Sequence, residues 1–71
     1  MNIGKAINKA LAQKVLENDE ISHRELAARS GLSTVTISHI MSGKTKGSTD
    51  TWKSIAKGLN MRLSELIALD E

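Results

Sequence analysis

Four side chains between residues 34 and 39 could contact a partner molecule, but they do not form a catalytic arrangement. Ile37 and Ile40 lie three residues apart, which is the spacing of the buried side of a helix. By the same period, the positions that face outward are Thr34, Val35, Ser38 and His39. Hydroxyls donate or accept hydrogen bonds, valine methyls can pack on a thymine methyl, and an imidazole can donate to guanine. This is the chemistry of contacting base edges in a DNA groove.

The chain lacks the residue combinations on which catalysis depends. There is no Ser-His-Asp arrangement, and two histidines without any cysteine give no metal-ligand spacing. The run Gly43-Lys44-Thr45 is similar to the end of a phosphate-binding loop, but that motif needs a glycine where this chain has Ser38. We therefore predict a protein that is not an enzyme and uses no metal or cofactor.

Two short predicted helices position the outward side chains. Ser22 and Glu25 form the Ser-x-x-Glu pattern of a capping box, which predicts a helix over residues 23–29. Ser33 is a second capping residue, and it predicts a helix over residues 34–41. Two short helices at a steep angle can place the second one in a DNA groove.

Small residues occupy the positions where this pair of helices must approach closely or turn sharply. Ala27 lies in the middle of the first helix, where a small side chain lets the second helix approach closely. Gly31 lies in the turn, where a positive φ angle favours glycine, and Gly43 stands where a left-handed C-cap is expected. Each feature is common by itself, but their combined spacing is specific.

Three further helices complete an all-α architecture of five helices. Apolar residues at helical spacing predict a first helix over residues 3–17, and Ile21 then returns to the core. A fourth helix begins after Ser48 or Thr49 and stops near Asn60, and a last one covers residues 63–68. The predicted buried positions are Ile3, Ile7, Ala10, Leu11 and Val15, then Trp52, Ile55, Ala56 and Leu59, then Leu63, Leu66 and Ile67. A chain of 71 residues suffices for a single domain over residues 1–71.

Charge is distributed unevenly in a chain whose net charge is only +2. Residues 44–62 are basic, and residues 17–25 are acidic. A basic segment directly after the second helix of the pair suits a surface that contacts phosphates, although solvation of exposed helices explains the lysines as well. No apolar run approaches the ~18 residues of a membrane span, so we expect a cytoplasmic protein without a membrane partner.

Ordered runs of residues resemble the Cro-like, or XRE, helix-turn-helix family, which includes the lambda-type phage repressors. They are Glu25-Leu26-Ala27, Gly31-Leu32-Ser33, Ile37-Ser38, Ser42-Gly43-Lys44, the run Ile55 to Asn60, and Leu63-Ser64-Glu65-Leu66. The resemblance covers Ile21 to Ile67 and implies a compact five-helix, lambda-repressor-like domain, with its helix-turn-helix over about residues 22–42. The implied function is a sequence-specific regulator of transcription, of the phage or prophage repressor type, that occupies operator DNA.

The resemblance also implies a role for each group of candidate residues. It places the base contacts at Thr34, Val35, Ser38 and His39. Contacts to the DNA phosphates are expected from the start of the first helix of the pair and from the loop after the second, and these residues are Ser22, His23, Ser42, Lys44, Thr45 and Lys46. Long side chains that make bidentate base contacts are missing from residues 34–39, which predicts modest discrimination between bases.

Two questions about partners stay open at this level. Weak base contacts favour a symmetric dimer on two half-sites, with Ile67 and Leu69 as the possible contacts, but these residues could equally close the core of a monomer. An acidic segment at residues 17–20, together with Val35 and Met41, also suits a protein-interaction module of the same fold that modulates a repressor or binds a toxin. The chain could be complete or the N-terminal part of a longer regulator.

Overall fold

The described part of the chain, residues 2–70, folds into five α-helices. In the computed structural model, which describes residues 2–70, these are α1 (Ile3–Leu16), α2 (His23–Ser30), α3 (Thr34–Ser42), α4 (Thr49–Gly58) and α5 (Leu63–Ala68). Residues 2–70 contain no strand, so the all-α prediction is confirmed, and each helix lies within one or two residues of its predicted bounds. None of the helices in this range is long and apolar enough to cross a bilayer.

Polar side chains cap the starts of the first four helices. Each accepts a hydrogen bond from the backbone amide three residues further on, and the four residues are Asn2, Ser22, Ser33 and Ser48. The capping box predicted at Ser22 is only half formed. The Glu25 carboxylate accepts a 2.8 Å hydrogen bond from the Arg29 guanidinium instead of returning to the backbone of Ser22. The ion pair between Glu25 and Arg29, one turn along the helix, therefore replaces the hydrogen bond that the capping box would place between the Glu25 carboxylate and the Ser22 amide.

The same backbone motif ends α1, α2, α3 and α4. A residue with a positive φ angle follows each helix, and the next amide donates to a carbonyl five residues earlier. The left-handed residues are Asn18, Gly31, Gly43 and Asn60, with φ angles of 61°, 71°, 83° and 58°. The three stops predicted at Gly31, Gly43 and Asn60 are confirmed. These turns fix the direction in which the chain leaves each helix.

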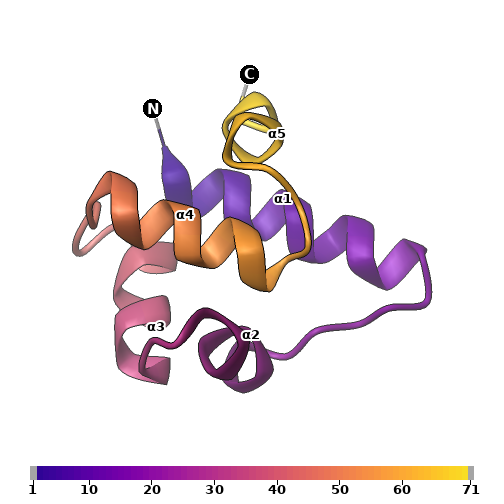
Figure 1. Cartoon of the computed structure of the whole chain (residues 1–71), viewed down its shortest axis with the longest axis horizontal. Coiled ribbons are helices and arrows are strands. Elements are labelled where there is room, and N and C mark those ends of the chain that lie inside the picture. The colour runs from indigo at the N-terminus through magenta and orange to yellow at the C-terminus, as the bar shows by residue number, and fades with distance from the viewer. Residues whose placement is uncertain (1, 71) are drawn as a thin grey trace.

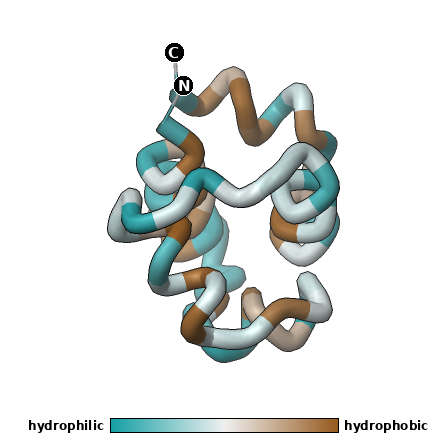
Figure 2. The backbone as a smooth tube through the Cα atoms, turned by 90° about the vertical axis from the view of Figure 1, so that its left-hand side faces the viewer, coloured by the Kyte–Doolittle hydropathy of each residue, from teal (hydrophilic) through white to brown (hydrophobic). Residues whose placement is uncertain are grey.

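Helices α1 and α4 form a middle layer, with α5 on one side of it and the α2–α3 pair on the other (Figure 1). In Figure 1, α5 lies at the top and α2 with α3 at the bottom, and α1 and α4 run between them. Figure 2 keeps this order when the molecule is turned by a quarter and shows the start of α1 close to the end of α5 near the top. The Asn2 amide donates a 2.8 Å hydrogen bond to the Asp70 carboxylate there. The helix pair α2–α3 therefore lies at the opposite end of the molecule from α5.

A single apolar cluster joins all five helices. Its largest fully buried side chains are Ile7, Leu26, Ile37, Ile40, Ile55, Leu59 and Leu66. Ile21 and Ala27 are buried as predicted. The prediction for Val15 is wrong, because this side chain is 52% exposed near the end of α1, where no other helix covers it. Trp52, Leu63 and Ile67 are only half-buried.

Two glycines allow helices to pack more closely than any other residue would. A Cβ atom at Gly4 would lie 2.7 Å from the Ile40 carbonyl oxygen and 2.8 Å from that of Met41, where α1 meets the end of α3. A Cβ atom at Gly58 would lie 2.6 Å from the Ser30 hydroxyl, where α4 meets α2. Both glycines therefore lie where the α2–α3 pair packs against the rest of the molecule, and at Gly4 the neighbouring atoms belong to the backbone.

We expect Ser30→Ala to stabilise the fold. The Ser30 hydroxyl is buried beside Gly58 and has no hydrogen-bond partner among the described residues. Removing a buried, unpaired hydroxyl from a helix and leaving alanine should raise the free energy of unfolding by ~1 kcal/mol. Urea unfolding followed by circular dichroism measures the change. A loss of stability would indicate that the hydroxyl has a partner, such as a bound water.

Candidate nucleic-acid interface

Helix α3 has a buried side and an open side. Ile37 and Ile40 are 0% and 1% exposed and pack in the core, whereas Val35 is 61% exposed. Thr34 and Ser38 are also exposed, so three of the four predicted outward side chains lie free on one surface. The fourth, His39, is half-buried, because it follows the turn of the helix toward its packed side. The open side thus carries the hydroxyls of Thr34 and Ser38, the methyl groups of Thr34 and Val35, and part of the His39 imidazole.

The turn before α3 fixes how this open side is presented. The Leu32 amide donates to the Ala27 carbonyl at 2.9 Å, which closes the left-handed turn at Gly31. The Ser33 hydroxyl then accepts from the Thr36 amide at 3.1 Å and lies 2.9 Å from the Thr36 hydroxyl. The Thr36 side chain is half-buried, and its hydroxyl lies against the capping Ser33 hydroxyl. The neighbouring side chains are therefore the ones that can contact a partner.

The starts of α2 and α3 present backbone amides that are available to an anion. At α2, Ser22 caps the Glu25 amide, and within residues 2–70 the amides of His23 and Arg24 have no acceptor. At α3, Ser33 caps the Thr36 amide, and the amides of Thr34 and Val35 are likewise free in that range. The positive end of each helix dipole coincides with these donors, which favours a phosphate. Ser22 and His23 are exposed at the predicted position.

The loop after α3 is polar and exposed, and its backbone is held in place. The amides of Lys44 and Thr45 both donate to the His39 carbonyl, at 2.9 and 3.3 Å. The Trp52 indole donates to the Lys46 carbonyl at 2.5 Å and ties the loop to α4. The charged ends of both lysines remain in solvent. This indole contact could not be predicted from the sequence, because the direction of the Trp52 side chain depends on how α4 packs.

Besides Ser22, which caps α2, two more of the predicted phosphate contacts use their hydroxyls in hydrogen bonds within the chain. The Ser42 hydroxyl donates to the His39 carbonyl at 3.2 Å, so in this conformation it offers only its lone pairs. The Thr45 hydroxyl accepts from the Gly47 amide at 3.3 Å and keeps its own hydrogen for an acceptor. Of these two hydroxyls, Thr45 is the one suited to a phosphate oxygen.

The basic segment expected over residues 44–62 divides into two separate surfaces. Lys44 and Lys46 lie in the loop that follows α3. Lys53, Lys57 and Arg62 instead line a groove between α4 and α5. Because α5 lies at the other end of the molecule from α2 and α3 (Figure 1), we expect a DNA duplex along α3 to meet the first group rather than the second.

The remaining predicted residues lie at the C-terminal end of the chain. Ile67 is half-buried in α5, and Leu69 follows that helix and packs partly against the core. Leu69 thus contributes to the packing of its own domain, and both side chains are too covered to offer their full apolar surface to a second copy. No group of three or more potential metal ligands occurs among residues 2–70.

Comparison with known families gives one match. The model of the helix-turn-helix family matches residues 9–66, which include α2, α3 and α4 in full. Neither the curated proteins nor the solved structures gave a match. The matched range covers most of the chain and contains every candidate DNA contact named above.

Proposed function

The chain belongs to the helix-turn-helix family of DNA-binding transcription regulators, in its Cro/XRE-like branch, and we propose that it is a repressor of the phage or prophage type. Bound to an operator near a promoter, it would exclude the polymerase from that DNA. Its place of action is the cytoplasm, where double-stranded DNA is found. The observation that carries the proposal is the open side of α3, whose valine is 61% exposed beside free amides and a basic loop.

Base contacts in this proposal come from Thr34, Val35, Ser38 and the accessible part of His39. The N-terminal half of α3 enters the major groove, because Ile37 and Ile40 hold the helix to the core by its other side. The hydroxyls accept several base patterns, so the sharpest discrimination is expected where the valine methyls meet a thymine methyl. Because only these four side chains contact bases, the preference for an operator over other DNA should be modest.

Phosphate contacts clamp the two sides of the groove in the same proposal. The amides at the start of α2, near Ser22 and His23, hold one strand. The loop holds the other through Lys44, Thr45 and Lys46, and Ser42 joins them only by releasing its internal hydrogen bond. These contacts set the register and most of the affinity, and they carry no sequence information.

Two copies on one operator complete the proposal. A single copy has few base contacts, and a symmetric pair doubles them by occupying two half-sites one helical turn apart. Ile67 and Leu69 are the proposed contacts between the copies. Since both are half-buried and Leu69 already packs against its own core, we expect this pair to form on DNA more readily than in free solution.

The salt dependence of DNA binding tests the phosphate contacts. We expect Lys46→Ala to weaken binding to all sequences and to reduce the slope of log affinity against log salt concentration by ~1. Lys53→Ala is the matched control, because it removes the same charge from the groove between α4 and α5 and should leave the slope unchanged. If the two variants give equal slopes, the loop after α3 does not lie on the DNA.

A protein-interaction module is the second candidate function. The exposed methyls of Val35 and the acidic residues that follow α1 could contact a repressor or a toxin as well as α3 could contact DNA. Mobility-shift assays at low salt distinguish the two functions. A shift of random DNA, and a stronger shift of sites selected from a randomised pool, supports the repressor, whereas the absence of any shift supports the protein partner.

A further inference from the structure

The C-terminal end of α1 carries an exposed apolar and acidic surface, which we call the α1 knob. Leu16 is 85% exposed and Val15 is 52% exposed, and with Val35 they are the three large apolar side chains that are exposed within residues 2–70. Three exposed carboxylates follow within four residues, and the knob therefore consists of Val15, Leu16, Glu17, Asp19 and Glu20. Two adjacent exposed apolar side chains beside a polar rim have the arrangement of a contact surface.

The backbone of the α1 knob is held in a defined conformation. Asn18 takes a φ angle of 61°, the Asp19 amide donates to the Lys14 carbonyl at 2.8 Å, and the Asn18 amide donates to the Val15 carbonyl at 3.1 Å. Lys14 also reaches Glu17 at 3.8 Å. The apolar and acidic side chains thus project from a closed turn. Because the backbone of this segment is already ordered, it would lose little conformational entropy when it binds a partner.

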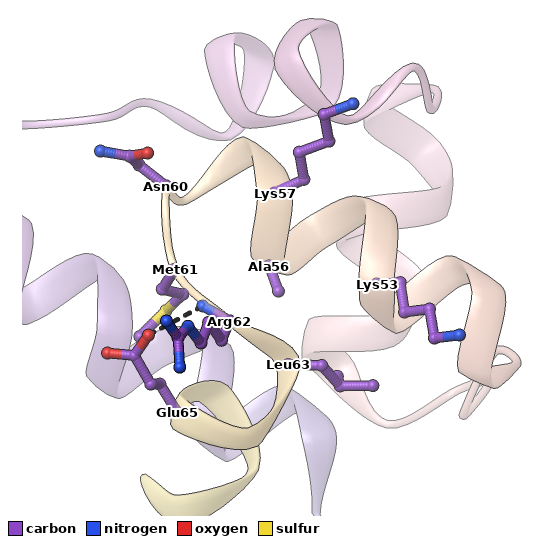
Figure 3. Close-up of a pocket in the computed structure, with 8 residues that line it drawn as sticks. All are labelled: Lys53, Ala56, Lys57, Asn60, Met61, Arg62, Leu63 and Glu65. Carbon is purple, nitrogen blue, oxygen red and sulfur yellow. Dashed lines mark hydrogen bonds between the residues drawn. The ribbon is translucent and has the colours of Figure 1, made fainter.

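The groove between α4 and α5 has the opposite character. Its volume is about 400 Å³, and apolar atoms of Ala56, Met61 and Leu63 form part of its lining. Figure 3 shows Lys53 and Lys57 extending from α4, with Arg62 at the start of α5. None of these three cations makes an ion pair among the described residues. The one carboxylate at the groove, Glu65, accepts a 3.0 Å hydrogen bond from the Arg62 amide and is held there.

These two surfaces complement each other and cannot pair with themselves. Two knobs brought together about a twofold axis would oppose carboxylates, and two grooves would oppose cations. A knob against a groove instead places three carboxylates near three cations and covers Leu16 with apolar atoms. We propose that the α1 knob of one copy docks in the α4–α5 groove of a second copy.

This contact joins unlike surfaces, so it leaves one knob and one groove free on the resulting pair. Further copies can add in the same way, and the assembly extends instead of closing. The contact uses neither α3 nor the loop that follows it. It is therefore separate from the proposed DNA contacts and does not require DNA.

Two variants that each lack one surface test the docking by nuclear magnetic resonance without DNA. Leu16→Lys removes the knob, and the paired changes Lys53→Glu and Lys57→Gln remove the groove. All three side chains lie on the surface, so both variants should fold. When nitrogen-15-labelled L16K is titrated with the unlabelled groove variant, we expect shifts of the groove amides alone. With the labels exchanged, we expect shifts of the knob amides alone, and both sets should fade as salt is added.

The controls separate docking from general electrostatic attraction. Labelled L16K titrated with unlabelled L16K should show no shift in the groove, since neither copy has a knob. Replacing Lys5 by glutamate and Lys9 by glutamine makes the same charge change elsewhere on the surface, and that variant should still accept a knob. The proposal is overturned if the groove amides do not move, or if one labelled variant shows shifts at both surfaces. Either result leaves the DNA-binding proposal untouched.

Discussion

Ile37→Ala is expected to leave the chain largely unfolded. Ile37 is 0% exposed and lies on the side of α3 that faces the core. Truncating a buried isoleucine to alanine costs ~2–5 kcal/mol, and a core of this size supplies only ~3–5 kcal/mol of net stability. Circular dichroism and the fluorescence of Trp52, the single tryptophan, measure the loss in a urea titration. DNA binding should fall in proportion to the folded fraction and recover where a stabilising solute restores folding.

Val35→Ala is the matched control, since it shortens a neighbouring side chain on the opposite side of the same helix. Val35 is 61% exposed, so its truncation should change the free energy of unfolding by less than ~0.5 kcal/mol. Under the proposed function, it should instead relax the preference for thymine at one operator position. If Val35→Ala destabilised the fold as much as Ile37→Ala does, the assignment of the two sides of α3 would be wrong.

The starts and ends of the helices follow from the sequence because they are decided locally. The hydroxyls of Ser22, Ser33 and Ser48 cap amides only three residues away, and no distant contact is needed to place them. The left-handed stops at Gly31 and Gly43 depend on the backbone freedom of the residue itself. The open side of α3 follows for a similar reason, because the period of a helix fixes which side chains face away from two buried isoleucines.

Features that depend on how distant segments pack could not be predicted from the pattern. The basic residues 44–62 look continuous along the chain, but α4 and α5 carry three of them to a groove away from the loop. Val15 continues the apolar period of α1, yet that helix extends past the elements that would cover it. Periodicity shows which side of a helix is apolar, but it does not show where along the helix the neighbouring elements end.

Gly4 is the clearest example of such a feature. A glycine in the first turn of a helix gives no signal by itself, and alanine would be preferred there by intrinsic propensity. Its role appears only where α3 arrives, with the carbonyl oxygens of Ile40 and Met41 closer to an added Cβ atom than van der Waals contact allows. Gly4 is thus a position where a tertiary contact overrides the local preference.

We therefore expect Gly4→Ala to destabilise the protein despite the helix propensity of alanine. Both atoms that the Cβ would meet, at 2.7 and 2.8 Å, belong to the backbone and cannot rotate away. Overpacking costs ~1–3 kcal/mol, and we expect the upper part of that range here, which outweighs the ~1 kcal/mol that alanine gains over glycine in a helix. Because α3 must move away from α1, binding to selected DNA sites should weaken even under conditions where the variant is fully folded.

Lys5→Ala is the control for this prediction, since it places alanine at the next, exposed position of the same helix turn. It should change the free energy of unfolding by less than ~0.5 kcal/mol and leave the selected operator bound as before. Urea unfolding and mobility shifts on both variants provide the comparison. A Gly4→Ala protein as stable as the unsubstituted chain would mean that α1 and the end of α3 lie further apart than their backbone contact indicates. The position of α3 relative to the core would then not depend on a residue without a side chain.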